Sequence, residues 1–239
     1  MRLGAVIAAG GVGSRMGTGE SKQLMMLAGR PVLAWSTAIF QNAPEVEEIV
    51  IVIDPADTRR CRAEVVEPFG LEKVGSIVPG GENRATSVLN GLQQLSGDID
   101  TVLIHDGARP LFPPGLLLSG LRDLAADDCD GVVFGLPLTD TVKEVGIGTR
   151  LITRTPDRSR LWAAQTPQIF KRVKLENAYH VRPSVLAEAT DDSFLVERIG
   201  GWMKISPGSA ENIKITTPED IVVAEEILRR REIKGHIGK

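Results

Sequence analysis

The sequence lacks several features that would narrow its function at once. Its 239 residues include only two cysteines, Cys61 and Cys129, and their wide separation predicts neither a metal site nor a redox motif. Unpaired cysteines are typical of a reducing compartment. No apolar run reaches the ~18 residues that a membrane span needs, and the N-terminus predicts a strand and no signal peptide. We therefore expect a cytoplasmic protein with no membrane partner.

The sequence also lacks a large excess of positive or negative charge. The formal net charge is −3, with 25% charged and 42% hydrophobic residues, which is ordinary for a globular protein. This balance gives no reason to expect nucleic-acid binding, so any anion site must be local. There is no HExxH, cysteine cluster or GxSxG motif, so the reaction needs no activated protein nucleophile. Without repeats or a linker, we expect residues 1–239 to form one domain.

The N-terminal stretch carries the strongest local signal. Residues 3–9 are an apolar run that predicts a buried strand, and a glycine-rich loop with two cations, Arg15 and Lys22, follows it. Glycines let backbone N–H groups approach phosphates, and the cations add fixed positive charge. The loop fits neither the P-loop nor the dinucleotide fingerprint. A phosphate site is the first interpretation, and a surface loop with solvated charges is the alternative.

Strands and helices alternate over the first 136 residues. This order predicts right-handed βαβ units, hence an α/β protein: a Rossmann-like three-layer sandwich around a mostly parallel twisted sheet. Ligands of such sheets bind beyond the carboxyl ends of the strands, where the loops 10–22, 80–84 and 105–110 should meet. The expected strands are 3–9, 48–53, 74–78, 101–104 and 131–136, and the expected helices are 32–42, 57–69, 84–95 and 114–126.

Residues 137–161 break this pattern with alternating, β-branched sequence around Gly146-Ile147-Gly148. A lone hairpin is marginal in water, so this β-arm should pack on another surface, such as a second subunit. The remaining segments are expected to be helices at 171–181, 192–199 and 218–231, strands at 202–205 and 212–215, and a loose tail at 232–239.

Four further segments hold candidate ligand-binding groups. Asp106 could lie near a nucleotide or a phosphate-bound magnesium ion, and Arg109 could bind a second anion. Alternatively, the two residues form a pair that merely tightens a turn. His105 is expected to be a hydrogen-bonded structural residue. Residues 80–87 could bind an anion or a base edge, with an ordinary helix cap as the alternative. Taken alone, Lys214 would be a surface charge and residues 190–193 a cap. Glycine-rich backbone with nearby cations favours phosphoryl or nucleotidyl transfer.

Together, several segments resemble one family, 2-C-methyl-D-erythritol 4-phosphate cytidylyltransferase. The segments are AAGGVGSRMG with Lys22, GGENRATSV, HDGARP, PLTDTVK, TPDRSRLW, AQTPQIF, ATDDSF and ENIKIT, in order along nearly the whole chain. The resemblance implies transfer of a cytidylyl group from CTP to 2-C-methyl-D-erythritol 4-phosphate, with Mg²⁺ or another divalent cation. It also implies a homodimer in which the arm 137–161 serves the partner's site.

The resemblance assigns roles to individual residues. Catalytic roles fall on Arg15, Lys22, Arg158 and Lys214. Nucleotide-binding roles fall on Ala8, Ala9, Gly10, Gly11, Gly13, Gly80, Gly81, Arg84, Ser87 and Asp106, with Asp106 also the metal ligand. Substrate-binding roles fall on Arg109, Thr141, Arg158, Thr166, Thr190 and Lys214.

Three positions depart from the family's common residues. Gly107 replaces alanine, Glu211 replaces aspartate and Asp192 replaces glutamate. Alternatives from the same reasoning are a ribitol 5-phosphate cytidylyltransferase, a non-catalytic nucleotide-binding domain and a Rossmann oxidoreductase. The missing third glycine of the dinucleotide fingerprint disfavours the oxidoreductase.

Overall fold

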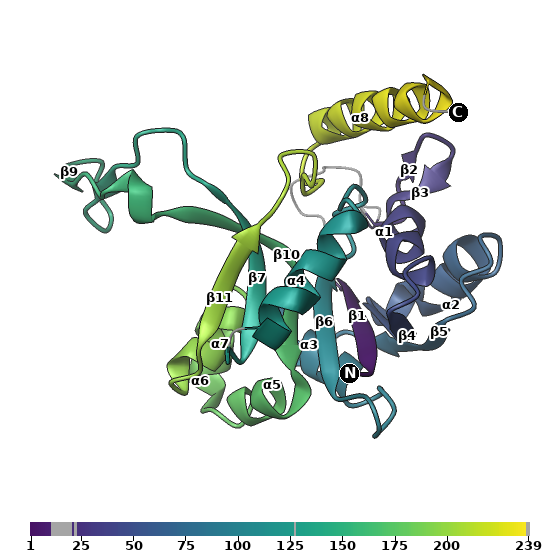
Figure 1. Cartoon of the computed structure of the whole chain (residues 1–239), viewed down its shortest axis with the longest axis horizontal. Coiled ribbons are helices and arrows are strands. Elements are labelled where there is room, and N and C mark those ends of the chain that lie inside the picture. Colours follow the sequence, from purple (N-terminus) through teal and green to yellow (C-terminus); the bar gives the residue numbers. More distant parts are fainter. Residues whose placement is uncertain (11–20, 22, 127, 238–239) are drawn as a thin grey trace.

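The fold is built on one seven-stranded sheet (Figure 1). The computed structural model describes residues 1–10, 21, 23–126 and 128–237. Along the sheet the strands follow the order β11-β7-β10-β6-β1-β4-β5. Their bounds are Leu3–Ala9 (β1), Val46–Ile53 (β4), Val74–Pro79 (β5), Thr101–Asp106 (β6), Gly131–Pro137 (β7), Trp162–Lys171 (β10) and Met203–Pro207 (β11).

The sheet is mostly parallel, as predicted. Strands β1, β4, β5 and β6 run parallel, and β11 is parallel to β7. Strand β10 is the exception, because it pairs antiparallel with both β6 and β7. Strand β10 was not predicted from the sequence, although it lies inside the sheet between β6 and β7.

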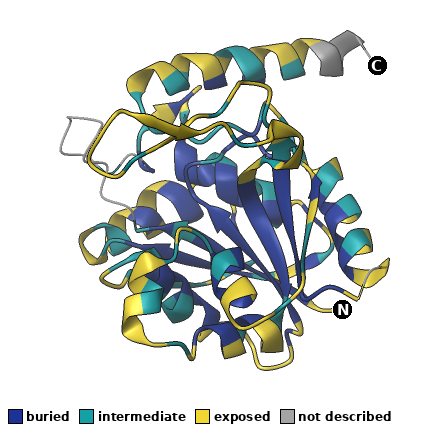
Figure 2. Ribbon diagram, turned by 90° about the vertical axis from the view of Figure 1, so that its left-hand side faces the viewer, coloured by how far each residue is buried: buried dark blue, intermediate teal, exposed yellow. Residues whose placement is uncertain are grey.

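Alternation along the strands explains the two-sided core. In β1, Ala5 and Ile7 pack in one buried cluster while Val6 between them packs in the other. In β4, Ile51 likewise packs in the first cluster and Val52 in the second. Successive side chains of a strand point to opposite faces, so a continuous apolar run is buried on both sides. Figure 2 shows the strands buried and the outer faces of the helices exposed.

Helices cover both faces. On one face α1 and α4 join the first cluster, together with a helical segment that begins as 3-10 helix and ends as π-helix. On the other face α3, α5 and α7 join the second cluster. The bounds are Val32–Gln41 (α1), Pro55–Asp57 (η1), Thr58–Arg60 (α2), Cys61–Val66 (η2), Arg84–Leu92 (α3), Gly115–Ala126 (α4), Arg172–Ala178 (α5), Pro183–Glu188 (α6), Asp192–Arg198 (α7) and Pro218–Ile237 (α8).

The C-terminal helix α8 forms a third cluster at one end of the body. Ala224 and Leu228 of α8 pack with Leu27, Leu111 and Ile215. Leu27 belongs to a small ribbon of β2 (Met26–Leu27) and β3 (Arg30–Pro31). The predicted loose tail 232–239 is wrong over its first part, because α8 continues to residue 237.

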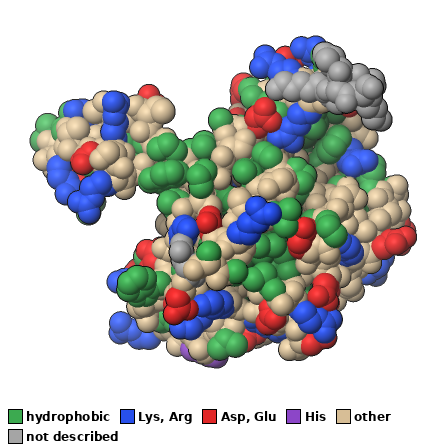
Figure 3. All heavy atoms as spheres, in the orientation of Figure 1, with side chains coloured by type: hydrophobic (Ala, Val, Ile, Leu, Met, Phe, Trp, Pro, Cys, Tyr) green, Lys and Arg blue, Asp and Glu red, His purple; other side chains and the backbone are tan. Residues whose placement is uncertain are grey.

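The arm projects from the body as a separate lobe (Figures 1 and 3). It contains the two-stranded ribbon of β8 (Glu144–Val145) and β9 (Ile152–Arg154), followed by the short 3-10 helix η3 (Arg158–Arg160). Its tip exposes apolar side chains, and Ile147 is fully exposed. The predicted two-stranded excursion is therefore present.

One predicted strand is wrong. Residues 212–215 form no strand, although Ile213 and Ile215 alternate with polar residues. Ile215 instead packs in the third cluster, and its N–H donates to the carbonyl of Ala108 at 2.8 Å. The alternation reflects burial against a helix and a loop, not pairing in the sheet. The short helix α6 (Pro183–Glu188) was not predicted.

Candidate active site

The carboxyl ends of three parallel strands meet at the middle of the sheet. Ala8 of β1 is in register with Asp106 of β6, and Ala9 is in register with Ile53 of β4. Strands β4 and β5 follow β1 on one side of the sheet, and β6 lies on the other side of β1. The order of the strands therefore reverses at β1. Ligands of open α/β sheets bind at such points. The predicted convergence of the loops after β1, β5 and β6 is confirmed for their described residues.

A first cavity of about 260 Å³ lies at this edge. Polar and small residues from β1, the turn before α3, the end of β6 and the segment before α8 line it. They are Ala8, Gly10, Gln23, Gly81, Glu82, Asn83, Arg84, Ser87, Asp106, Ala108 and Lys214.

Two glycines allow the loops to approach closely. A Cβ on Gly80 would lie 3.2 Å from Ser87 Oγ and 3.7 Å from Gly10 Cα. A side chain at either glycine would therefore fill the space between the β1 and β5 ends. The absence of a Cβ at both positions keeps this space open for a ligand. Ala9, by contrast, is buried in the first core cluster, so any contact with a ligand would come from its backbone.

The turn before α3 is both a helix cap and a wall of the cavity. The Asn83 side chain accepts from the N–H of Thr86 at 2.9 Å, and Thr86 Oγ1 accepts from the N–H of Asn83 at 3.1 Å, which is a capping box. Ser87 Oγ accepts from the N–H of Gly81 at 2.9 Å and donates to the carbonyl of Asn83 at 2.8 Å. The alternative interpretation of a cap is therefore correct for Asn83, while Ser87 fixes the glycine turn that borders the cavity.

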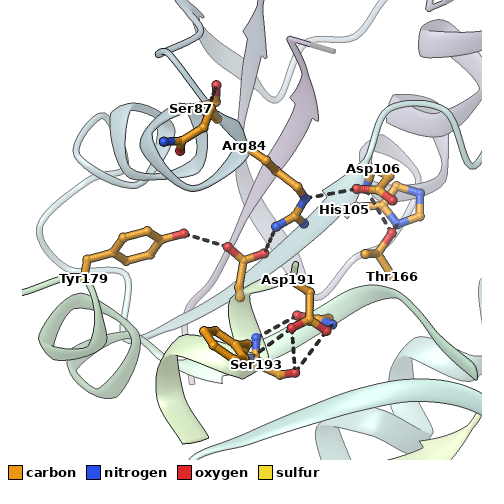
Figure 4. A network of polar contacts seen from close by, with 12 residues as sticks. Arg84, Ser87, His105, Asp106, Thr166, Tyr179, Asp191 and Ser193 are labelled. Atoms are coloured by element: carbon orange, nitrogen blue, oxygen red, sulfur yellow. Dashed lines mark hydrogen bonds and ion pairs between the residues drawn. The ribbon is translucent and has the colours of Figure 1, made fainter. Parts of the chain in front are cut away.

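Asp106 lies among three cations, of which Figure 4 shows Arg84. Lys214 Nζ lies 2.8 Å from its Oδ2, Arg109 Nε lies 3.5 Å from the same oxygen, and Arg84 Nε lies 3.5 Å from Oδ1. Burial would raise the pKa of Asp106, but the charges of Arg84, Lys214 and Arg109 outweigh burial and lower that pKa well below its usual value. Three cations around one carboxylate leave an excess of positive charge for an anionic ligand.

His105 is held as a neutral structural residue, as expected. It is fully buried, and its Nε2 lies 2.9 Å from the carbonyl of Arg109, to which it can only donate. Its Nδ1 then accepts from Thr166 Oγ1 at 3.2 Å, and Thr166 Oγ1 accepts from the N–H of Asp106 at 2.9 Å. Burial lowers the pKa of His105 to about 4. The ring therefore organises the loop after β6 and is no base at neutral pH.

The segment before α8 places Lys214. Arg109 Nη1 donates to the carbonyl of Asn212 at 2.8 Å, and the Asn212 amide donates to the carbonyl of Thr166 at 2.9 Å. These contacts tie the segment to β6 and β10 without a strand ladder. Glu211 takes no part in the cluster around Asp106, since its carboxylate accepts from Arg231 of α8 at 2.9 Å.

A second cavity of about 230 Å³ adjoins the first. The two share Arg84, Asp106 and Lys214, which therefore form the wall between them. The second cavity is further lined by Arg109, Ala164, Gln165, Thr166, Gln168, Thr190 and Asp191. Two adjoining polar cavities with a shared charged wall are suited to binding two phosphorylated ligands side by side.

Asp106 is the residue that the sequence resemblance assigns to a divalent cation, and it lines both cavities. No group of three or more His, Cys, Asp or Glu gathers as metal ligands within the described part of the chain. Mg²⁺, however, is often bound by one or two carboxylates with substrate phosphates and water completing its shell. Lys214 occupies Oδ2 of Asp106, whereas Oδ1 has the longer Arg84 contact of 3.5 Å. The donor set therefore fits a magnesium ion that arrives with a polyphosphate.

The other predicted site residues fall into two groups. Gly11, Gly13, Arg15 and Lys22 lie outside the described residues. Thr141 and Arg158 belong to the arm and are exposed, with Arg158 Nη1 donating to the carbonyl of Thr139 at 2.7 Å. Within this chain they are not part of either cavity lining.

Sequence reasoning missed one part of the network. The fully buried Asp192 accepts from Arg84 Nη1 at 2.7 Å and from the hydroxyl of Tyr179 at 2.6 Å. The neighbouring Asp191 is the cap that residues 190–193 predicted, because it accepts from the N–H of Phe194 at 3.0 Å. Tyr179 is the sole tyrosine of the chain, yet no local motif connects it to Arg84.

The fold and the site define the class of protein. A mostly parallel α/β sheet, with a cation-lined double cavity where the strand order reverses, is typical of enzymes that act on nucleotides and other phosphorylated ligands. The chain belongs to the IspD family, 2-C-methyl-D-erythritol 4-phosphate cytidylyltransferase, whose sequence profile matches residues 3–230.

Individual relatives agree with this assignment. The 2-C-methyl-D-erythritol 4-phosphate cytidylyltransferase of Geotalea uraniireducens is 42% identical over 231 residues, covering 96% of this chain and 97% of the relative. That of Pelotomaculum thermopropionicum is 43% identical, covering 97% and 96%. The crystal structure of 4-diphosphocytidyl-2C-methyl-D-erythritol synthase from Anaerococcus prevotii superposes with a TM-score of 0.80 at 28% identity, covering 95% of this chain and 96% of that one.

Proposed function

We propose that the protein transfers the cytidylyl group of CTP to 2-C-methyl-D-erythritol 4-phosphate, forming 4-diphosphocytidyl-2-C-methyl-D-erythritol and pyrophosphate. The observation that carries the proposal is the wall of Arg84, Asp106 and Lys214 shared by two adjoining polar cavities. Family membership over residues 3–230 supplies the identity of the two ligands.

The first cavity is the nucleotide site in this proposal. Gly10 and Gly81 carry no side chains, so they leave room for the nucleotide beside the turn that Ser87 holds in place. The second cavity takes the methylerythritol phosphate, with Arg109 and Thr166 among its lining residues. The acceptor phosphate then meets the CTP α-phosphate at the wall.

The reaction is an in-line displacement. An oxygen of the methylerythritol phosphate forms a bond to the α-phosphorus of CTP, and the bond from that phosphorus to the β-phosphate oxygen breaks, releasing pyrophosphate. The attacking phosphate is already an anion, so no base is needed, and the neutral His105 offers none. Lys214 offsets negative charge at the wall, and we assign Arg15 and Lys22 to the charge that develops on the α-phosphoryl oxygens.

A magnesium ion belongs to this proposal. Asp106 would hold it together with the nucleotide phosphates, and the ion would supply further positive charge at the transferring phosphoryl group.

The proposal extends to a homodimer through the arm. The arm's exposed apolar side chains at Val145, Ile147, Leu151 and Ile152 support it, because an isolated hairpin with such a surface gains stability by packing on a partner. Thr141 and Arg158 would then serve the partner's site. A cytoplasmic location is also part of the proposal, supported by the two buried cysteines, Cys61 and Cys129, which form no disulfide bond.

The test is a pyrophosphate-release assay with CTP and either methylerythritol 4-phosphate or ribitol 5-phosphate. We expect turnover with CTP and methylerythritol phosphate, and much slower release with ribitol phosphate. Release with ribitol phosphate alone, or with neither polyol, would contradict the proposal.

A further inference from the structure

The Arg84 guanidinium is held by two carboxylates from different parts of the chain (Figure 4). Its Nη1 donates to Asp192 Oδ2 at 2.7 Å, while its Nε lies 3.5 Å from Asp106 Oδ1. The tighter contact is with Asp192, at the start of α7, and not with Asp106 in the shared wall. Asp192 is therefore the carboxylate that chiefly holds the guanidinium.

Asp192 is itself fixed by Tyr179. The carboxylate is 0% exposed, and its second oxygen accepts from the tyrosine hydroxyl at 2.6 Å. The Tyr179 ring is buried in the second core cluster, so the hydroxyl has a rigid base. A hydrogen bond to a buried charged group is stronger than one between neutral groups, so its loss frees the carboxylate to move. The three side chains form a line from the core to the wall of the cavities.

The guanidinium has unused hydrogen-bonding capacity. Its third nitrogen, Nη2, is buried and has no hydrogen-bond partner among the residues that the structure describes, although Arg84 lines both cavities. A buried donor without an acceptor is costly, so an acceptor beyond these residues would complete the arrangement. The adjoining cavities point to an anionic oxygen of a ligand.

We propose that Asp192 and Tyr179 are positioning residues for nucleotide binding: they hold the Arg84 guanidinium in the shared wall, ready for a phosphate oxygen of CTP, and keep it from closing onto Asp106. Neither Asp192 nor Tyr179 lines the two cavities. Their effect on the ligand is therefore exerted through Arg84. This inference rests on the proposed use of the first cavity for CTP.

The experiment measures CTP affinity by calorimetry, together with KM and kcat, for the full chain and for two variants. Tyr179→Phe removes only the hydroxyl, and Asp192→Asn removes the charge that holds Arg84. We expect CTP binding to weaken about 3- to 10-fold for Tyr179→Phe and at least 10-fold for Asp192→Asn, seen in Kd and KM more than in kcat. Asp192→Glu, which keeps the charge, should bind CTP more tightly than Asp192→Asn.

Val196→Ala is the matched control. Val196 is on the same helix α7 and is fully buried in the same core cluster, so its truncation destabilises this region without removing a contact of Arg84. We expect a lower melting temperature for Val196→Ala with unchanged CTP affinity. If Val196→Ala weakens CTP binding as much as Tyr179→Phe does, the effect is general loosening of α7, and the inference is overturned.

A double-variant cycle gives the sharpest outcome. With Arg84→Lys, which lacks the forked guanidinium, the further change Tyr179→Phe should alter CTP affinity less than 2-fold. An undiminished effect of Tyr179→Phe in that background would overturn the inference. Because calorimetry needs no turnover, failure of the pyrophosphate assay would count against the proposed function, whereas parental CTP affinity in Tyr179→Phe would count against this inference alone.

Discussion

Burial of His105 makes a measurable prediction about folding at mildly acidic pH. The pKa of His105 falls from the usual 6.5 to about 4 because burial disfavours the charged ring. The unfolded chain takes up the histidine proton near pH 6.5, whereas the folded protein does so only near pH 4, so the free energy of unfolding falls as the pH drops from 6.5 towards 4. For this pKa shift the free energy of unfolding is lower by about 1.4 kcal/mol at pH 5.5 and by about 2.5 kcal/mol at pH 4.5 than at neutral pH.

The assay is urea unfolding of the parent and of His105→Gln at pH 7.5, 5.5 and 4.5. Glutamine keeps a donor for the carbonyl of Arg109 but does not titrate, so the variant should lack this part of the pH dependence. The other two histidines of the chain are present in both proteins, so their contributions cancel in the difference. Equal slopes for parent and variant between pH 7.5 and 4.5 would refute the reasoning.

Three further predictions concern the loop, the core and the arm. Arg15→Ala and Lys22→Ala should each lower kcat about 100- to 1,000-fold with little change in melting temperature, and near-parental turnover would remove the assigned role. Gly91→Ala should destabilise the protein by about 1–3 kcal/mol in urea unfolding, because its Cβ would lie 2.6 Å from Val52 Cγ2, and parental stability would show that the core adapts. Ile147→Asp should weaken self-association in sedimentation, and an unchanged mass would argue against the arm as interface.

The fold could be predicted where the chain has long apolar runs. Strands β1, β4 and β6 are buried on both faces, so their continuous hydrophobicity identified them. Strand β10 (Trp162–Lys171) was not predicted because its first three residues are exposed, and its buried part, which begins at Gln165, contains polar residues and a proline. Its place between β6 and β7 depends on pairing with residues far away in the sequence.

The candidate site was predictable in part, for a similar reason. Gly10, Arg84 and Asp106 follow strands or open a helix, so the topology alone places them at one edge. The link from Arg84 to Asp192 spans 108 residues and passes through a buried side chain. Local sequence gives no signal for such a contact, and Asp192 could equally have been part of the cap formed by its neighbour Asp191.

The most direct test of the account is a crystal structure with bound CTP. The account predicts the nucleotide in the first cavity, with its base end beside Gly81 and Ser87 and its α-phosphate at the wall of Arg84, Asp106 and Lys214. It further predicts the ammonium group of Lys22 turned towards the phosphates. A nucleotide ordered elsewhere, or Lys22 pointing into solvent beside bound CTP, would contradict the central claim.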